Sequence, residues 1–581
     1  MPTSGKKKGK YNVAKQRSFV GMFEKCHHVF YHEWQNDELA MNVPPNSPAR
    51  NAAAVLAAEV GPRFNPWTFI PVLYFMQAIP VTLVQEVATI VYKDLGIANE
   101  PITRWTSLIS LPWALQMLLG PLVDLNSTKR KWTLTGQAMI ALGLILAAFA
   151  NELPGAFAIS LVILGATAVT SALCNIATDG FYMLALNKDL QAVFAGVQST
   201  SYRFGRLFCV GVLVGVAGIL TDRFHLSKEA AWTVVMGAAA VVYGLGYVAC
   251  RATLPYPEAD VKTTEADSKE TSRNVARTFA ILTLGVGGYF MLNALTRLSA
   301  QGLWQVLDGQ PNGALHGWIL PAQSDLFGFL LPGIQAEQIQ LGICASVVVI
   351  AFFASRALLR GSVMEGAFTS FLRLPKIGWI FGFILFYRFG EAMVSKMSPL
   401  FLKDSVAAGG LAINNEQLGA IKGIAGVSGI ILGGLAGGLI ISRLGIKKAF
   451  LPMAILMHVP NLLYLWASLA HPVVGAMYFV DFMDQFGYGF GFAGYMIYLM
   501  RVAQRGNYRT AHYAIGTGLG ALCIVMAGIL SGILQHNFGY PGFFTAVMIC
   551  TIPGTITLFF IPLDDPIPPA EPIQIPKGVP V

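Results

Sequence analysis

The stretch IGWIFGFILFYRFGEAMVSKMSPLFLK, residues 377–403, decides how this chain is organised. It is apolar and long enough to cross a lipid bilayer, which takes about 20 such residues in a helix. Its interior nevertheless contains Arg388, Glu391 and Lys396. Each such charge costs roughly 2.5–3.5 kcal/mol at the centre of a bilayer, so we expect this helix to face other helices or a water-filled cavity.

Arg388 and Glu391 are three residues apart, so they share one face of the predicted helix near its middle. Two interpretations of this pair are open. It is either an internal ion pair that holds the helices together, or part of a site for a substrate or a coupling ion. The second role is the usual one for charged residues inside a membrane.

The composition of the whole chain indicates a membrane protein with many spans. Of the 581 residues, 54% are hydrophobic and only 12% are charged, whereas charged residues make up about 25% of a typical soluble protein. The net charge of +9 comes from Lys and Arg in loops and near the N-terminus, which is typical of orientation signals and not of a nucleic-acid surface. The seven cysteines, and the patch that holds Cys26, His27, His28 and His32, fit no common spacing for disulfides or metal ligands.

Apolar segments predict an all-α polytopic protein with fourteen transmembrane helices, arranged as two bundles of six and an extra central pair. The predicted domains are a cytoplasmic N-terminal extension with a surface helix (1–64), a six-helix bundle (65–253), a cytoplasmic linker (254–277), the extra pair with an outer segment (278–360), a second six-helix bundle (361–564) and a disordered Pro-rich tail (565–581). The predicted spans are 66–92, 105–123, 132–150, 155–183, 191–220, 231–252, 278–297, 340–359, 377–402, 417–441, 449–470, 474–500, 510–533 and 541–562.

The distribution of basic residues predicts the orientation of these spans. Residues 127–131, 443–448 and 501–509 are rich in Lys and Arg, while the connections that follow the first span and the span 377–402 hold few. Because basic loops stay in the cytoplasm, this asymmetry places both termini there.

The two six-helix blocks contain a duplicated pattern. VYKDLG (residues 91–96) ends the first span, and FLKDSV (residues 401–406) ends the corresponding span of the second block. The next span of each block runs into a short basic loop, in GPLVDLNSTKRK (residues 120–131) and GGLIISRLGIKK (residues 437–448). This loop resembles the motif after the second helix of each half in the major facilitator superfamily, where it forms a latch. The resemblance assigns the latch to Gly120, Asp124, Lys129, Arg130 and Arg443.

In that superfamily the first, fourth, seventh and tenth of twelve helices line a central cavity, and here the corresponding helices all contain charges. Glycines at small-xxx-small spacing, Gly211/Gly215 and Gly419/Gly423, predict close helix packing in the fifth and eighth helices. The predicted substrate and proton pathway comprises Glu391, Arg388, Asp484, Asp179, Arg203, Lys396, Asn175, Tyr202, Asp481, Arg206 and Glu86.

Several stretches are similar to AmpG-type muropeptide permeases, a family related to the acetyl-CoA transporters of the endoplasmic reticulum. SALCNIATDGFY (residues 171–182) resembles their ATQDIAIDAYR, and SYRFGRL (residues 201–207) resembles their GYRLG. LYFMQAIPVTL, SLPWALQMLLGPLVD and YRTAHYAIGTGLGAL are also similar to stretches of that family. The resemblance covers about 66–252 and 377–562, and implies proton-driven import of anhydro-muropeptides across a bacterial inner membrane. Asn175 stands at the first acidic position of the fourth-helix stretch, so only Asp179 is acidic there.

These observations predict a proton-coupled secondary transporter that imports a bulky anionic solute. The first candidate for this solute is a muropeptide-like compound, and the alternative is acetyl-CoA or another anionic metabolite. Arg388 and Arg203 can bind a carboxylate or phosphate through their planar guanidinium groups. A buried carboxylate can load and release a proton, and we assign this role to Glu391 first, Asp484 second and Asp179 third. No phosphate-binding loop is present in the sequence, which argues against ATP-driven pumping. We expect no cofactor, and the partners expected are the bilayer and a small solute, with the protein acting as a monomer.

Two other classes of function stay open on the sequence alone. An integral-membrane transferase could use His458 or His512 as a base, although no nucleophile or metal constellation accompanies them. A sensor or scaffold that transports nothing would suit the N-terminal extension and the outer segment near Trp304 and Trp318.

Overall fold

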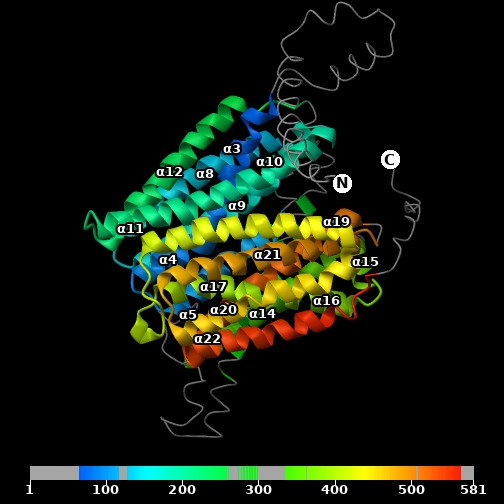
Figure 1. Ribbon diagram of the computed structural model, residues 1–581. Helices are drawn as coiled ribbons and strands as arrows, with labels where there is room; N and C mark the ends of the chain where they lie inside the picture. The colour runs from blue at the N-terminus through cyan, green and yellow to red at the C-terminus, as the bar shows by residue number, and fades with distance from the viewer. Residues whose placement is uncertain are drawn as a thin grey trace, which may run out of the picture. The chain divides into compact units, whose positions relative to one another are not determined.

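The described part of the chain is helical throughout in the computed structural model (Figure 1). The structure describes residues 65–563 except 117, 118, 120–122, 124–126, 187, 258, 259, 261–271, 274, 275, 278, 282, 286, 289, 292, 293, 296, 297, 299–333, 361, 362, 506 and 507. The predicted surface helix in 1–64, the Pro-rich tail, Gly120 and Asp124 therefore lie outside the described residues. All described residues belong to one compact unit that begins at Phe64.

The first six spans are drawn in blue to green in Figure 1. Span 1 is interrupted by a π-helical turn, and so is span 5. Side-chain caps start two of the helices, since Thr128 and Ser227 accept hydrogen bonds from the amides of Lys131 and Ala230. In chain order the elements are η2 (Pro66–Thr68), α3 (Ile70–Thr82), η3 (Leu83–Val87), α4 (Ala88–Asp94), α5 (Asn99–Leu108), α6 (Leu111–Ala114), α8 (Lys129–Ala150), α9 (Ala156–Ala185), α10 (Lys188–Leu207), η4 (Phe208–Leu213), α11 (Val214–Asp222) and α12 (Lys228–Thr253).

The remaining helices include one member of the predicted extra pair, α14, and the second block. The elements are α14 (Ile334–Leu359), α15 (Val363–Leu372), α16 (Ile377–Phe386), α17 (Phe389–Lys403), η6 (Val406–Ala408), α18 (Asn415–Gly419), η7 (Ala420–Gly426), α19 (Val427–His458), α20 (Asn461–Ala470), α21 (Val474–Ala503) and α22 (Arg509–Thr557).

The loops predicted after 417–441 and 510–533 are reduced to single glycines. Gly445 in α19 has φ 74° and ψ 158°, and Gly539 in α22 has φ 65° and ψ −175°. These are conformations that glycine adopts at little cost. Each of these two helices is therefore interrupted at its glycine, which lies inside the predicted connection 442–448 or 534–540.

Nine stretches of the described residues are helices long and apolar enough to cross a membrane, and two of them, Asn415–Ala470 and Ala511–Thr557, contain these reversals. Large apolar side chains are exposed at helical spacing on α8, α12 and α22, as expected for helices that face lipid. The protein is therefore an integral membrane protein, while the total of fourteen spans stays a prediction. The exposed side chains include Met139, Leu142, Leu146 and Phe149 on α8, Val234, Val241, Leu245 and Val248 on α12, and Ile549, Ile552 and Ile556 on α22.

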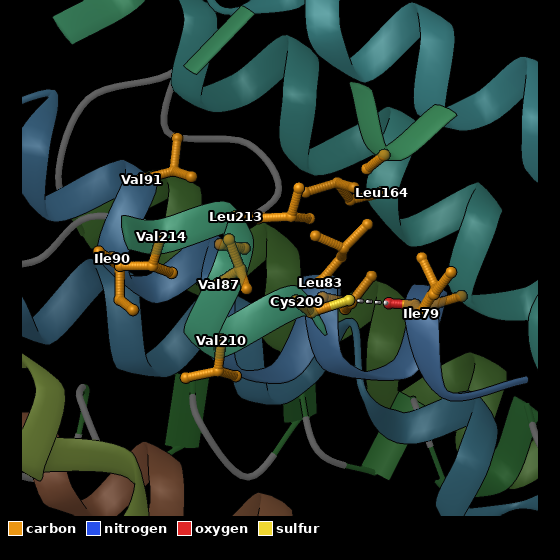
Figure 2. Packing of buried hydrophobic residues seen from close by; sticks show 14 of the residues in the cluster. Ile79, Leu83, Val87, Ile90, Val91, Leu164, Cys209, Val210, Leu213 and Val214 are labelled. Atoms are coloured by element: carbon orange, nitrogen blue, oxygen red, sulfur yellow. Dashed lines mark hydrogen bonds between the residues drawn. The ribbon is translucent and has the colours of Figure 1, made fainter. Parts of the chain in front are cut away.

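Span 1 packs against span 5 in the core of the first block. Figure 2 shows Ile79, Leu83 and Val87 directed toward Cys209 and the valines that follow it, and Cys209 Sγ lies 3.9 Å from the carbonyl oxygen of Ile79. The apolar residues of span 1 recur every three or four positions, so they form one buried stripe. This packing fixes the depth of the charged residues that the same two spans contain.

From here on the spans are numbered without the extra pair, so that span 7 is 377–402, span 8 is 417–441, span 9 is 449–470, span 10 is 474–500, span 11 is 510–533 and span 12 is 541–562. The two blocks approach closely where span 5 crosses span 8. A Cβ atom built on Gly419 would lie 2.7 Å from the backbone nitrogen of Gly215, and Gly211 packs in the same way against Gly423. Only glycines allow backbones to come this close, so the packing predicted from their spacing is confirmed.

Candidate functional site

Charged residues gather where the helices depart from regular α geometry. Glu86 and Lys422 lie in the π-helical turns η3 and η7, and Arg206 lies two residues before η4. Arg388 lies at the break between α16 and α17. Turns of the π type widen a helix locally and occur frequently at functional sites. The irregular geometry therefore marks the middle of the molecule as the candidate site.

In the first block the charges are paired or hydrogen-bonded. Arg206 donates to both carboxylate oxygens of Glu86, from Nε at 2.8 Å and from Nη2 at 3.2 Å. Tyr202 interacts with this pair. The hydroxyl of Tyr74 donates to Asp179 at 3.1 Å. Spans 1, 4 and 5 are therefore joined by polar contacts.

The helix predicted over 377–402 is not continuous. Arg388 has φ −102° and ψ 2° and forms the N-cap position of α17. Next to the break, Gly390 and Gly554 bring α16 and α17 into close contact with α22. The rule that residues three apart share a face applies only within one helix. Arg388 is the N-cap residue of α17 and Glu391 lies in the first turn of that helix, so the common face of these two residues stays a prediction.

The internal ion pair, one of the two interpretations of Arg388 and Glu391, is not formed among the described residues. Arg388 Nη2 donates to the hydroxyl of Tyr488 at 2.7 Å. Its guanidinium carbon lies 4.6 Å from the ring centroid of Phe492 and 5.5 Å from that of Tyr495. Within the described part of the chain Arg388 forms no salt bridge, and its buried Nε has no hydrogen-bond partner. Spans 7 and 10 thus face each other as expected, but through a cation held by aromatic rings.

Two buried carboxyl groups lie on the same two helices: Glu391 three residues after Arg388, and Asp484 one turn before Tyr488 on α21. Glu391 is 3% exposed and Asp484 is fully buried. Asp484 accepts a hydrogen bond of 2.9 Å from Gln485 through Oδ2, while Oδ1 is unpaired. Because two carboxylates in one buried site cannot both be ionised at low cost, this arrangement favours a bound proton.

Lys422 is a functional candidate that the sequence reasoning missed. Its Nζ forms an ion pair of 2.5 Å with Asp481 and hydrogen bonds of 2.7 Å with Ser398 and 3.3 Å with Tyr464. The glycines around Lys422 directed the interpretation of this span toward packing alone. A single Lys in an otherwise small and apolar span was the signal available.

Removal of Lys422 is expected to destabilise the protein strongly. Lys422→Met leaves Asp481 buried without its cation, and loss of one partner of a buried pair costs about 3–5 kcal/mol of folding free energy. The double variant Lys422→Met/Asp481→Leu should recover most of this loss. Arg223→Gln removes an exposed ion pair with Glu416 and serves as the control. Thermal unfolding in one detergent compares the four proteins, and equal midpoints for Lys422→Met and Arg223→Gln would contradict the expectation.

A cavity of about 690 Å³ opens between the two blocks, on the side of the molecule where α8 and α22 begin and α9 ends. This size is typical of small-molecule sites. Asp179 is exposed to it, and Asn175 is buried one turn earlier on the same helix. Glu391 and Asp484 do not line it. The lining includes Trp113, Gln116, Lys129, Asp179, Tyr513 and Thr517.

Two other predicted cations have different surroundings. Lys396 donates to the carbonyl oxygen of Gln85 at 3.2 Å, which joins span 7 to span 1. Arg203 is half-buried, and its Nη2 would lie 3.4 Å from a Cβ atom on Gly434 of span 8. Both cations therefore lie where the two blocks meet.

Lys129 and Arg130 of the predicted latch contact the residues that follow α12. The backbone amides of Lys129 and Arg130 donate to the carboxylate of Asp260, at 2.7 and 2.9 Å, and Arg130 lies 3.8 Å above the ring of Tyr256. Arg443 is exposed. The described half of the latch thus ties the start of α8 to the residues that follow α12.

The transferase hypothesis gains no support from the two histidines. His458 is buried against the ring of Tyr387, with centroids 5.9 Å apart. Among the described residues there is no group of three His, Cys, Asp or Glu side chains that could hold a metal ion.

The fold is similar to that of solved POT family transporters. A solved POT family transporter in complex with a thioalcohol-conjugated peptide aligns with a TM-score of 0.57 at 11% identity, over 85% of this chain and 95% of that one. A peptide transporter POT in complex with sulfate gives 0.56 at 14% identity, over 87% and 97%. At these identities the likeness shows the fold.

Curated relatives confirm the resemblance to AmpG proteins. The anhydromuropeptide permease of Escherichia coli K12 is 23% identical over 175 residues, which are 30% of this chain and 34% of the permease. Putative transporter AmpG 4 of Rickettsia felis is 22% identical over 179 residues, or 31% and 41% of the two chains. The chain thus spans less than half the length of the curated relatives it matches. No family model matches it. These relatives are named as a permease and a transporter and not as enzymes, which supports the expectation that this protein is not an enzyme.

Proposed function

We propose that this protein is a secondary active transporter that imports a bulky anionic solute, muropeptide-like in character, together with protons. The observation that carries the proposal is Arg388, a cation enclosed by aromatic rings between two helices that each contain a buried carboxyl group. A guanidinium without a carboxylate partner is suited to bind a carboxylate or phosphate of a solute. The aromatic rings around it are suited to pack against the solute's apolar or sugar surface.

The carboxyl groups supply the coupling in this proposal. Glu391 and Asp484 together hold one proton more readily than two negative charges. When an anion binds at Arg388, a protonated Glu391 avoids a third negative charge in a buried place, so proton and solute bind together. Asp179, at the cavity, is the group placed to exchange protons with water.

The orientation is part of the same proposal. We place both termini in the cytoplasm of a bacterial cell and the protein in its inner membrane, because the basic connections lie on one side. The cavity lined by Lys129 then opens toward the cytoplasm.

Uptake by the full chain in proteoliposomes tests the function directly. The expected result is accumulation of an anhydro-muropeptide when the outside is acidic, and loss of accumulation when a protonophore collapses the gradient. Accumulation of acetyl-CoA under the same gradient instead would favour the alternative substrate. A scaffold would move no solute under any gradient, and a transferase would release a chemically altered solute, and either outcome would contradict the proposal.

A further inference from the structure

The ends of span 1 and span 7 hold two ion pairs that cross between the blocks. Lys93 pairs with Asp404, and Lys403 pairs with Asp94. The four residues are the Lys-Asp dipeptides of the duplicated sequences VYKDLG and FLKDSV. All four side chains are 17% exposed or less. Each block therefore contributes one cation and one carboxylate to a shared, largely buried cluster.

Each carboxylate also has two further donors, one asparagine and one aromatic side chain. Asp94 accepts from Asn415 at 2.7 Å and from the indole nitrogen of Trp232 at 2.9 Å. Asp404 accepts from Asn99 at 2.8 Å and from the hydroxyl of Tyr540 at 2.5 Å. Asn99 and Asn415 occupy equivalent places, since each is the first residue of the helix that follows its Lys-Asp pair.

The two asparagines also bind the two lysines. Lys93 donates to Asn99 Oδ1 at 2.8 Å, and Lys403 donates to Asn415 Oδ1. Trp232 comes from span 6 and Tyr540 from span 12, the last helix of each block. The cluster of eight residues thus repeats one arrangement twice, and it lies where the two related blocks meet.

The cluster and the cavity lie at opposite ends of the membrane spans. Span 2 begins with α5 beside Asp94 and runs toward the start of α8, where Lys129 lines the cavity. At the end that holds the cluster, the blocks are in backbone contact, because a Cβ on Gly218 would lie 2.9 Å from the carbonyl carbon of Asn415. The described chain is therefore closed at this end and open at the other.

A cluster of this kind can hold the two blocks together in one register and still allow them to separate. Removing both pairs from water costs nearly as much as their attraction returns, so the net stability they add is small. Separating the blocks at this end must break both pairs in one movement, and each freed charge is then hydrated. No charge is left buried without a partner in either state.

We propose that Lys93, Asp94, Lys403 and Asp404 form a reciprocal gate that closes the transport pathway at the end of the spans opposite the cavity. The inference rests on the proposed transport function, because a gate implies that the blocks separate at this end during a cycle. Asn99, Asn415, Trp232 and Tyr540 fix the rotamers of the two carboxylates, so that the two pairs form only when the blocks are in register.

Labelling of a buried probe measures the gate without any solute. Ser107 is 4% exposed and lies on α5, about two turns after Asn99 of the cluster, where span 2 packs against Gly528 of span 11. In the full chain in lipid nanodiscs, Ser107→Cys should react slowly with a charged maleimide. Adding Asp94→Asn and Asp404→Asn should raise its rate roughly tenfold or more, the scale of the coupling between close charge pairs.

A charge exchange separates a gate from a merely structural contact. Lys93→Asp and Asp404→Lys should each speed the labelling of the probe, and the double exchange should slow it again toward the parent rate. Glu416→Gln is the control, because it breaks an exposed ion pair with Arg223 between the same blocks at the same end. Its labelling rate should equal that of the parent.

Two results would overturn the gate. One is equal labelling in the parent and the Asp94→Asn/Asp404→Asn variant. If that variant does not fold, the charge exchange decides. The gate is then overturned when the probe in the double variant Lys93→Asp/Asp404→Lys reacts as fast as it does in each single variant. If the labelling rate responds as expected but the protein transports no solute, the proposed transport function is contradicted. The opening movement at the cluster is supported in that case.

Discussion

Arg388→Gln is expected to abolish saturable binding of an anionic solute while the protein still folds. The guanidinium forms one hydrogen bond, to Tyr488, and has no carboxylate partner among the described residues, so its removal leaves no opposite charge stranded. A hydrogen bond to a charged group contributes about 1.5–3 kcal/mol, and a bidentate contact with an anion involves two. The affinity should therefore fall by roughly two orders of magnitude or more, and uptake should fall with it.

The conservative replacement tests the geometry of this contact. Arg388→Lys keeps the charge but loses the planar fork and its stacking on Phe492 and Tyr495. We expect intermediate affinity, with Arg223→Gln as the control at an exposed ion pair. Calorimetric titration of the solute in one detergent compares all four proteins. Unchanged affinity in Arg388→Gln would show that Arg388 has a structural role and that the anion binds elsewhere.

Glu391→Gln should uncouple the solute from the proton gradient. Glutamine resembles the protonated side chain, so the variant should bind solute and exchange it across the membrane at equal concentrations. It should lose accumulation driven by a pH gradient, because no proton can leave the site. Wild-type uptake should rise as the external pH falls, since a proton enters with each solute, and in Glu391→Gln this dependence should flatten.

Asp484→Asn provides the comparison for that experiment. Asp484 accepts a hydrogen bond from Gln485. Its replacement should weaken coupling without removing it, because Glu391 is still able to bind and release a proton. Paired measurements of counterflow and of accumulation against a pH gradient are needed for each variant. If Glu391→Gln still concentrates solute with the wild-type pH dependence, the coupling site is not Glu391.

The sequence was sufficient to predict the features that depend on composition and on the periodic spacing of residues. Apolar length and the placement of Lys and Arg indicated the spans, and small-residue spacing located the contact between Gly211 and Gly423. The duplicated sequences located the ends of spans 1 and 7. Charges inside apolar spans identified Glu86 and Arg206, which the structure joins in a bidentate pair.

What the sequence could not supply was the choice of partners. Arg388 and Glu391 are neighbours in sequence, and the simplest pairing was between them. The break before Phe389 directs Arg388 to Tyr488 of span 10. These two residues are 100 positions apart in the sequence, so no local pattern could predict their contact. The crossed pairing of Lys93 with Asp404 has the same origin, because either lysine could pair with its own neighbour. Such choices are made when helices from different parts of the chain pack together.

The glycines at 445 and 539 also bear on how the protein is made. Each reverses the chain between two helices without an intervening loop, so the two spans leave the ribosome in immediate succession and must cross the bilayer as one hairpin. A residue with a Cβ atom at either position would disfavour this backbone conformation, which is almost confined to glycine, by roughly 1–3 kcal/mol. The expected damage is a hairpin that inserts wrongly during synthesis, which would appear as degraded protein and not as a slower transporter.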